Sequence, residues 1–490
     1  MTETPYPLRN GKYIEDPRLA EKMRYIVSRH PELRPGNETG YTWDEAGLAD
    51  LFSECYKSDT RYCAEAKSWY TYHDGAWRRD VGSLYVAENI KEFARLMDLY
   101  CGEITDEDTR KKYYAFINRL GDRRFRERLM KDAASVFPIP AEQFDADLYL
   151  INCLNGTYDL KNMVFREHDW HDYLTMQTNF EYTVQSVHCL RWERFVDEVT
   201  CGDKDKADYL QRALGYSILG SSKEACMFIL HGKSTRNGKS TLLGAIQHLL
   251  GDYATVSPVS IICKSDRARA ADAASPTIAA LKGKRFVTMS ESNQYGRLDE
   301  EAIKTLTGGE KISARNLYEH QMTFLPQFTL WLSCNDLPSV RDESLFASDR
   351  IKVIEFLRHF SESERDTSLA DTFRQPDSMR GIFTWLVEGY FKYLRFGLSM
   401  PEPMKQVIRK YAADNDIVLQ FLEEKCTKSD DSGTLAKNLY AVYKTWCTTN
   451  GYYVMSAKKF TSGIEMHPEY HNGRVKRDGL SFFRGLVFRS

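Results

Sequence analysis

Residues 226–243 read CMFILHGKSTRNGKSTLL: an apolar run, a loop bounded by glycines, and Gly-Lys-Ser-Thr ahead of a helical pattern. A strand, a loop of this kind and a helix in that order are typical of a Walker A phosphate loop. Glycines let backbone amides approach phosphates, a lysine adds positive charge, a serine hydroxyl suits Mg²⁺, and the helix N-terminus contributes its positive end. The stretch therefore predicts a nucleotide site built from Gly232, Asn237, Gly238, Lys239, Ser240 and Thr241.

This loop is longer than the usual pattern. Five residues separate Gly232 from Gly238, whereas the Walker A pattern has four. We expect the crown of the loop, residues 233–237, to bulge. The pattern does not determine which contacts these residues make. The alternative is a chance Gly-Lys-Ser at a turn, but a strand before it and a helix after it argue against that interpretation.

A nucleotide hydrolase also needs a carboxylate on a neighbouring strand. The apolar run 285–289 is followed by Ser290 and Glu291. A carboxylate there could orient or deprotonate the attacking water and reach Mg²⁺ through water. Ser290 stands where many Walker B motifs have Asp, so one acid is present. We predict that Glu291 is catalytic and shares the metal site with Ser240; the alternative is a polar residue that merely ends a strand.

Apolar runs alternate with helical segments from about Lys204 to Phe360. The alternation favours an α/β layer with a largely parallel sheet. Strands are expected at residues 225–230, 285–289, 328–334 and 351–356. The third of these delivers Asn335 to its carboxyl end, where the ligands of open α/β sheets gather. Between them, Gly308-Gly309 stop a helical pattern, and an extended hairpin with basic and aromatic groups follows.

In this order the motifs resemble the superfamily 3 helicases, specifically the poxvirus and phage/plasmid primase-helicase branch of the AAA+ ATPases. The resemblance rests on Asn237 to Thr241, Ser290-Glu291, Lys304 with Thr307 to Glu310 and Ala314-Arg315, Asn335-x-x-Pro338, and Asp349-Arg350. It extends more weakly over Trp69 to Asp80 and Asn155 to Leu160. In total, the resemblance covers the chain from about Tyr41 to Cys426.

The resemblance implies a ring, usually hexameric, that hydrolyses ATP with Mg²⁺ at subunit interfaces and translocates 3′ to 5′ on single-stranded DNA. It assigns Lys239 and Ser240 to phosphate and Mg²⁺. It makes Glu291 the Walker B acid and Asn335 the sensor that positions water.

The same resemblance makes Arg350 the finger that reaches a neighbour's γ-phosphate. A planar, permanently charged guanidinium suits charge that is spread over phosphoryl oxygens. The family often has a paired arginine where this chain has Asp349-Arg350. Arg341 and Arg358 therefore stay open as alternatives, as does a structural ion pair at Arg350.

In the family the hairpin after Gly308-Gly309 points into the central channel and grips DNA. The candidates here are Lys311, Arg315, Tyr318 and His320. Cations for phosphates and an aromatic ring for base stacking are what single-strand binding needs. A solvated hairpin is the alternative.

Five regions are expected. They are an arm (1–42), a mixed α+β collar domain (43–203), an AAA+-like P-loop ATPase core (204–360), a helical C-terminal part of the motor (361–426) and, after a linker at 427–434, a winged-helix-like tail (435–490). Nine cationic residues against three acids give the tail a charge of +6. We interpret the tail as a winged helix-turn-helix for duplex DNA or a partner; a structural lid is the alternative.

The chain as a whole is close to neutral. Its 490 residues carry a formal net charge of −2, so DNA contact must use local basic surfaces. Its eleven cysteines include no Cys-x-x-Cys pair, which favours reduced thiols. Without a signal peptide or an apolar stretch of spanning length, we expect no membrane association and a place in the cytoplasm, that of a bacterial host.

The leading hypothesis is an ATP-dependent replicative DNA helicase of a phage, plasmid or mobile element. It would form a homo-hexamer on single-stranded and forked DNA. The family's fused primase domain is not expected here, so a separate primase or other replication proteins would be partners. The alternative is a replication initiator or DNA-binding scaffold that uses ATP as an assembly switch.

Overall fold

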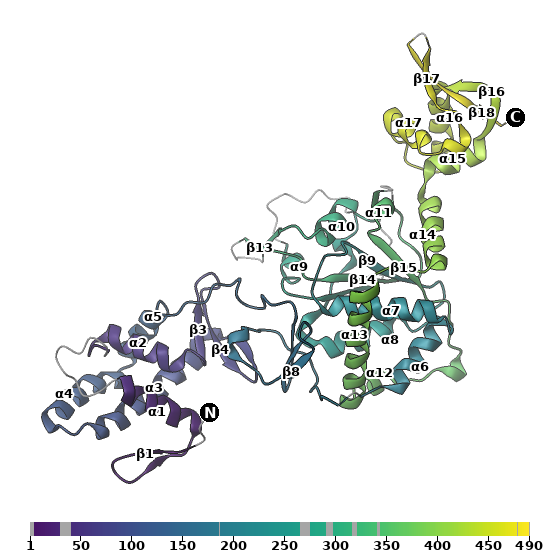
Figure 1. Ribbon diagram of the computed structural model, residues 1–490. Coiled ribbons are helices and arrows are strands. Elements are labelled where there is room, and N and C mark those ends of the chain that lie inside the picture. The colour runs from purple at the N-terminus through teal and green to yellow at the C-terminus, as the bar shows by residue number, and fades with distance from the viewer. Residues whose placement is uncertain are drawn as a thin grey trace. The chain divides into compact units, whose positions relative to one another are not determined.

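The computed structural model describes residues 4–29, 41–185, 187–264, 275–290, 297–315, 321–340, 344–477 and 479–489. The chain divides into two compact units, Met1–Gln185 with Leu250–Asp252, and Ser186–Leu249 with Tyr253–Ser490 (Figure 1). The boundary was expected near residue 203. It falls earlier because helix α6 (Leu190–Thr200) packs on α7 (Lys204–Ile218) of the second unit.

The first unit is a helical cluster followed by two small antiparallel sheets. Its helices are α1 (Pro17–Arg29), α2 (Glu45–Tyr56), α3 (Leu84–Glu103), α4 (Glu107–Ile117) and α5 (Arg123–Ala133). Its strands are β1 (Tyr6–Pro7), β2 (Tyr13–Ile14), β3 (Thr60–Cys63), β4 (Ser68–His73), β5 (Ala76–Arg79), β6 (Leu150–Cys153), β7 (Gly156–Asp159) and β8 (Val164–Arg166). The unit has the expected mixed α+β character, and its role as a collar stays a prediction.

The N-terminal segment differs from the expected arm. Within residues 4–29, Pro17 occupies the first position of α1, where its missing N–H costs nothing. Ala20, Met23 and Ile26 follow at helical spacing and are fully buried in the core of the first unit. Pro17 therefore starts a helix and does not mark a loop.

The Asp74-Gly75 pair makes a tight turn. Both residues have positive φ, 52° and 77°, and they join β4 to β5 in an antiparallel hairpin. This backbone twist matches the twist of the flanking strands. A second antiparallel hairpin is formed by β6 and β7.

The second unit is built on a five-stranded parallel sheet of order β10-β11-β14-β9-β15. Its strands are β9 (Met227–His231), β10 (Ala254–Val256), β11 (Phe286–Ser290), β14 (Thr329–Cys334) and β15 (Ile351–Glu355). Four of them lie at the expected positions. The short edge strand β10 was not expected, because three residues give too little pattern to read.

Helices and loops cover both faces of this sheet, as parallel sheets require. On one face Phe228 and Phe286 pack around Trp331, whose Nε1 donates to Ser217 of α7 at 3.0 Å. On the other face alternate strand residues join the apolar side of α10 (Glu300–Thr307). The fully buried strands explain why they read as continuous apolar runs.

Further elements of this part complete its helical shell and a small hairpin. They are α8 (Lys239–Leu250), α9 (Pro276–Ala279), β12 (Ile312–Ala314), β13 (Met322–Phe324), α11 (Ser344–Ala347), α12 (Leu369–Phe373), α13 (Pro376–Phe396) and α14 (Glu402–Asn415). Helices α7 and α13 pack closely against each other.

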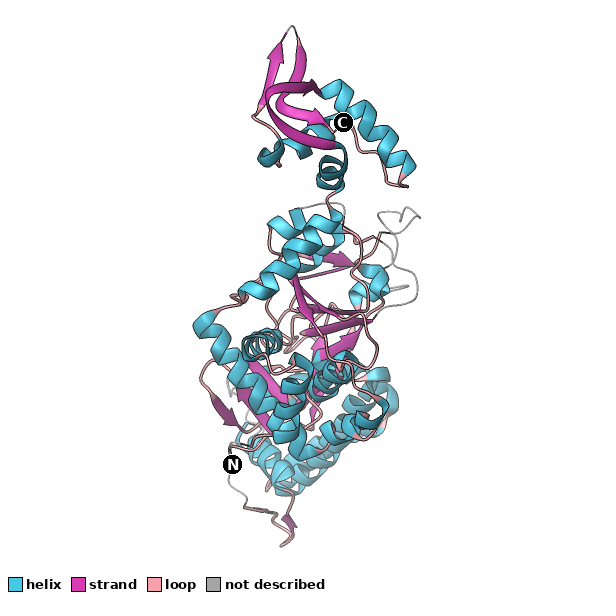
Figure 2. Cartoon of the chain, turned by 90° about the vertical axis from the view of Figure 1, so that its right-hand side faces the viewer, coloured by secondary structure: helices cyan, strands magenta, loops and turns pink. Residues whose placement is uncertain are grey.

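The C-terminal part has its own apolar core. Its elements are α15 (Ile417–Lys425), β16 (Cys426–Leu435), α16 (Ala436–Thr449), α17 (Ala457–Glu465), β17 (Arg474–Arg477) and β18 (Leu480–Phe488), the strands forming an antiparallel sheet (Figure 2). The prediction of a linker at 427–434 is wrong, because these residues belong to strand β16. The pairing of β16 with β18 is irregular between Lys428 and Gly433. Pairing with β18 satisfies its backbone despite its polar side chains.

All eleven cysteines are free, as the sequence predicts, and most are buried. In the described part of the chain, no helix is both long and apolar enough to cross a bilayer.

Candidate active site

The phosphate loop connects the carboxyl end of β9 to the first turn of α8, as expected. Both bounding glycines are required by space. A Cβ on Gly232 would lie 2.4 Å from the carbonyl oxygen of Phe356, and one on Gly238 would lie 2.5 Å from Val199. Gly238 also has a φ of +88°, in the region that favours glycine. The loop backbone can therefore lie close to its surroundings only with glycine at both positions.

Lys239 joins the phosphate loop to the strand that carries Asn335. Its ammonium Nζ donates to the carbonyl of Gly232 at 2.9 Å and to Oδ1 of Asn335 at 3.1 Å. Lys239 is only 5% exposed, and both of these acceptors are neutral. An anion placed at the loop would meet this buried ammonium group.

The extra residue in the crown is absorbed by Arg236 and Asn237. Arg236 has a φ of 56°, which turns the backbone sharply. The amide Nδ2 of Asn237 donates to the carbonyl of Ser234 at 2.6 Å and to that of Gly232 at 3.3 Å. Asn237 is 4% exposed, so its side chain fills the loop from inside. The expected bulge is therefore a turn closed by one amide.

The segment after β15 binds the outside of the crown. Phe360 N–H donates to the carbonyl of Arg236 at 2.9 Å, and Nδ1 of His359 lies 2.8 Å from the carbonyl of Thr235. These contacts were not predicted. They use backbone groups on the crown, which leave no signature in a sequence.

Strand β11 ends at the same edge of the sheet. Its last residue, Ser290, pairs with Ser333, which is followed by Cys334 and Asn335. Glu291 follows directly and lies outside the described residues. Ser240 and Thr241 lie in the first turn of α8, next to Lys239, with Ser240 exposed.

Arg350 lies at the other end of the sheet from the phosphate loop of its own chain. It precedes Ile351, which pairs with Met227 at the start of β9. The five residues of β9 separate this end of the sheet from the loop, which corresponds to about 17 Å at the rise of a parallel strand. Its Nη1 donates to Oγ1 of Thr307 at 2.8 Å and to the carbonyl of Ala225 at 3.3 Å.

Arg358 and Arg341 are the alternatives to Arg350 as the arginine finger. Arg358 forms an ion pair with Glu364, and its guanidinium lies 5.1 Å from the ring centroid of Phe360. Arg341 lies outside the described residues.

Strands β12 and β13 form the strand pair expected after Gly308-Gly309, whereas its contact with DNA stays a prediction. They pair antiparallel after α10 ends at Gly308, and Gly309 has a φ of 72°. Lys311 and Arg315 are exposed on it. Tyr318 and His320 belong to residues 316–320 and lie outside the described part.

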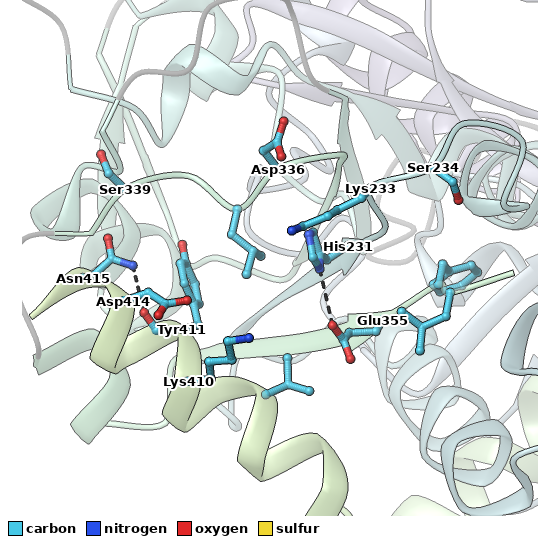
Figure 3. A pocket seen from close by; sticks show the side chains of 14 residues that line it. His231, Lys233, Ser234, Asp336, Ser339, Glu355, Lys410, Tyr411, Asp414 and Asn415 are labelled. Atoms are coloured by element: carbon cyan, nitrogen blue, oxygen red, sulfur yellow. Dashed lines mark hydrogen bonds and ion pairs between the residues drawn. The ribbon is translucent and has the colours of Figure 1, made fainter. Parts of the chain in front are cut away.

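A cavity of about 700 Å³ opens beside the start of the phosphate loop (Figure 3). It is lined by loop residues Lys233 and Ser234, the ends of β9, β14 and β15, and helix α14. His231 and Glu355 face each other in it, with Nδ1 and Oε1 3.7 Å apart. The His231 side chain holds the pKa of the Glu355 carboxyl below its usual value.

The residues at this edge fit a nucleoside triphosphate. A buried ammonium, a glycine-lined loop and the start of a helix are the groups that cradle phosphates. The described residues contain no cluster of three or more acidic, histidine or cysteine side chains that could hold a metal alone. Mg²⁺ usually takes one or two protein ligands together with substrate phosphates; Ser240 is the candidate ligand among the described residues.

Three protein families match separate stretches of the chain. Residues 49–201 match the D5 N-terminal-like family, and residues 413–482 match the poxvirus D5 protein-like family. The resemblance to the D5-like primase-helicases is confirmed. Between these stretches, residues 230–350, which hold the phosphate loop and Asn335, match a family of unknown function.

Curated proteins from several viruses are similar to this chain over part of its length. A protein named "Putative helicase" of Acanthamoeba polyphaga mimivirus is 27% identical over 449 residues, covering 82% of this chain and 45% of the relative. A protein of the same name from Invertebrate iridescent virus 3 is 24% identical, covering 62% and 36%. One from Sputnik virophage is 28% identical, covering 41% and 27%. The chain thus spans less than half the length of each relative.

Among solved structures, the apo C-terminal region of NrS-1 is similar at a TM-score of 0.47 and 9% identity, over 91% of this chain and 99% of that one. A similarity this low supports no conclusion about the site.

Proposed function

We propose that this D5-like chain is an ATP-dependent DNA helicase of viral or mobile-element replication, with a superfamily 3, AAA+-type motor. One observation carries the proposal: Lys239 of the phosphate loop and Asn335 of the adjacent strand are in direct contact, at 3.1 Å. A phosphate-binding cation and a polar sensor on neighbouring strands are the minimal parts of a P-loop hydrolase. The helicase names of the relatives support the same conclusion.

The roles follow from the positions. Lys239 would exchange its bond to Asn335 for a bond to the β- and γ-phosphates, which frees the Asn335 amide to hold the attacking water. Glu291, directly after β11, would orient that water or accept its proton. Backbone amides at the start of α8 would bind phosphate oxygens.

Mg²⁺ bound to the phosphates would neutralise part of the developing charge. Ser240 would hold it directly, and Glu291 through water. With these residues alone the chain supplies little more than positioning and charge, which is what phosphoryl transfer requires.

Assembly into a ring, hexameric in this proposal, would complete the site. Arg350 lies about five strand residues, or roughly 17 Å, from the phosphate loop of its own chain, so it can act only on a neighbour's nucleotide. Head-to-tail contacts that close on themselves make such a ring. The β12–β13 hairpin, with Lys311 and Arg315, would grip single-stranded DNA during 3′ to 5′ translocation, and a separate primase would act beside it.

The proposal is tested by strand displacement from a forked DNA duplex with ATP and Mg²⁺. The wild-type protein should separate the strands, and Lys239→Ala and Glu291→Gln should not. Lys405→Ala removes a positive charge from an exposed position on α14 and should leave unwinding unchanged. Equal displacement by wild type and Lys239→Ala would refute a helicase.

Subunit mixing tests the finger. Arg350→Ala subunits keep an intact phosphate loop, and Glu291→Gln subunits keep an intact arginine. Mixing the two should restore part of the ATPase activity that each lacks alone. A lack of rescue, with both proteins folded and assembled, would assign the finger to another arginine and leave Arg350 its bonds to Thr307 and Ala225.

A further inference from the structure

Thr307, the last residue of α10, holds two hydrogen bonds on one hydroxyl group. Its Oγ1 donates to the carbonyl of Ile303 at 2.7 Å, one turn back in the helix, and accepts from Nη1 of Arg350 at 2.8 Å. Thr307 is 3% exposed. A hydroxyl has one proton to donate, so the bond to Ile303 turns its lone pairs toward Arg350. The end of α10 therefore presents a fixed acceptor to the guanidinium group.

Arg350 has one other acceptor in the described part of the chain. Its Nη1 also donates to the carbonyl of Ala225, at 3.3 Å. The neighbouring carboxylate, that of Asp349, pairs with Lys352 instead. A guanidinium carries five N–H donors on three nitrogens, and both bonds of Arg350 use Nη1. Among the described residues, Thr307 is thus the one side chain that directs this guanidinium, and the donors on Nε and Nη2 remain for an anion.

Helix α10 is joined to the β12–β13 hairpin by a short connection and by a common core. Gly308 follows the last residue of the helix, and Ile312 begins β12. Ile312 is buried in the same apolar cluster as Ile303 and Leu306 of α10. A close-packed cluster transmits a displacement because it has few voids that could absorb it. A shift of the hairpin therefore reaches the end of α10, where Thr307 lies.

A second bond ties the same face of α10 to the segment that leads to Arg350. Nζ of Lys304 donates to Oγ of Ser344, the first residue of α11, at 2.6 Å. Lys304 and Thr307 are three positions apart in sequence, so they lie on one face of the helix. The helix contacts the segment 344–350 at two points, which joins the position of the arginine to that of the helix.

We propose that Thr307 is a positioning residue that links the β12–β13 hairpin to the arginine finger. The inference rests on the proposed function, in which the hairpin grips single-stranded DNA and Arg350 reaches the nucleotide of a neighbouring subunit. The Thr307 hydroxyl would direct the guanidinium toward that nucleotide, and its own position would depend on the hairpin. DNA bound by one subunit would in this way raise the rate of ATP hydrolysis in the next.

The test is steady-state ATP hydrolysis with and without single-stranded DNA. Thr307→Val keeps the shape of the side chain and removes the hydroxyl, so DNA-stimulated kcat should fall about tenfold or more, the scale of one lost hydrogen bond to a charged group. The KM for ATP should stay within about twofold, because the finger acts in the transition state. Thr307→Ser keeps the hydroxyl and should keep most of the stimulation. Single-strand affinity, measured by fluorescence anisotropy, should be that of the wild type in both variants.

Thr305→Val is the matched control. It makes the same chemical change at an exposed position of the same helix. Its hydrolysis should be stimulated by DNA as in the wild type. A loss equal to that of Thr307→Val would overturn the proposal, because the effect would then belong to the helix and not to the bond with Arg350.

Subunit mixing separates positioning of the finger from damage to the subunit's own site. A Thr307→Val subunit keeps an intact phosphate loop, and a Glu291→Gln subunit keeps a wild-type Thr307 and Arg350. Mixing the two should therefore restore part of the DNA-stimulated hydrolysis. A lack of rescue would place the defect within the Thr307→Val subunit's own site and would overturn the proposal.

Two further outcomes would overturn the proposal. One is DNA stimulation of Thr307→Val equal to that of the wild type. The other is an equal loss in Thr307→Val and Thr307→Ser, which would make the role of Thr307 one of packing. In both cases a loss of hydrolysis in Arg350→Ala would leave the finger and the proposed function in place. Failure of the proposed function would show instead in the wild type, as strand displacement no faster than that of Lys239→Ala.

Discussion

Asn237 accounts for the unusual length of the phosphate loop. Its amide reaches the carbonyls of Ser234 and Gly232 and closes the extra turn that Arg236 begins. Removing this amide takes away the bond to the Ser234 carbonyl, whereas the Gly232 carbonyl still accepts from Lys239. A group left buried and unpaired costs about 1–3 kcal/mol. The crown is therefore held from inside by one side chain, and from outside by backbone contacts to His359 and Phe360.

Asn237→Ala should raise the KM for ATP about tenfold, because the crown amides are no longer held in position. Thr235→Ala is the control: Thr235 is exposed, and only its backbone carbonyl is used. Steady-state ATPase assays at several ATP concentrations measure both. A KM for Asn237→Ala within twofold of wild type would mean that the outer contacts alone hold the crown.

At the scale of elements, α7 and α13 approach each other closely enough to exclude side chains. A Cβ on Gly215 would lie 2.2 Å from the backbone nitrogen of Tyr390, and one on Gly389 would lie 2.2 Å from the carbonyl oxygen of Gln211. The opposing atoms are backbone atoms, so relief requires one helix to move. This contact fixes the helical layer that carries Ser217, the partner of Trp331 in the sheet.

Gly389→Ala should destabilise the second unit by about 1–3 kcal/mol through overpacking. Gly244 of α8 is the matched control. Nothing lies within 4 Å of a Cβ built there, so Gly244→Ala should stabilise the helix by about 0.5–1 kcal/mol. Urea unfolding of both variants measures the difference. Equal effects of the two substitutions would contradict the close packing of α7 and α13.

A second element-scale feature joins the start of α15 to the end of α17. Nε2 of His467 lies 2.8 Å from Oδ2 of Asp416, which also caps α15 by accepting from the N–H of Leu419. The hydrogen bond to Asp416, with a smaller contribution from Glu469, raises the pKa of His467. The pair therefore stabilises the fold most when the imidazole is charged.

The raised pKa of His467 sets the direction in which the stability of this region depends on pH. The stabilisation is fully present below the unfolded-state pKa of about 6.5 and is lost as pH rises through the raised folded-state value. Hydrogen exchange of backbone amides in α15 and α17, corrected for intrinsic rates, should quicken over that window in the wild type. His467→Gln should flatten the response. An equal pH response in both proteins would remove His467 as its source.

The central motor could be read from the sequence because its signals are local. The phosphate loop, four strands and Asn335 all follow from apolar runs and their end residues. Strand β16 could not be read, because its pairing with β18 comes from 50 or so residues away and its own residues are polar. The same holds for the crown contacts of His359 and Phe360, which are made to backbone carbonyls that any sequence supplies.

At the scale of the whole molecule, near-neutral charge conceals basic surfaces in particular places. The net charge of −2 belongs to a chain whose last 56 residues, from Leu435, carry +6. Lys311 and Arg315 add an exposed basic pair on the β12–β13 hairpin. Under the proposed function, DNA contact would use such local basic surfaces, and DNA affinity should fall as the salt concentration rises.

The most direct measurement is a double-mutant cycle on DNA-stimulated ATP hydrolysis with Lys239→Ala and Asn335→Ala. Each single variant should lower kcat about 100-fold or more, as expected for lost transition-state contacts. Because the two side chains are in contact and act on one phosphate, the double variant should be hardly slower than the worse single one. If the two losses instead multiply, Lys239 and Asn335 act independently and the proposed active site is wrong.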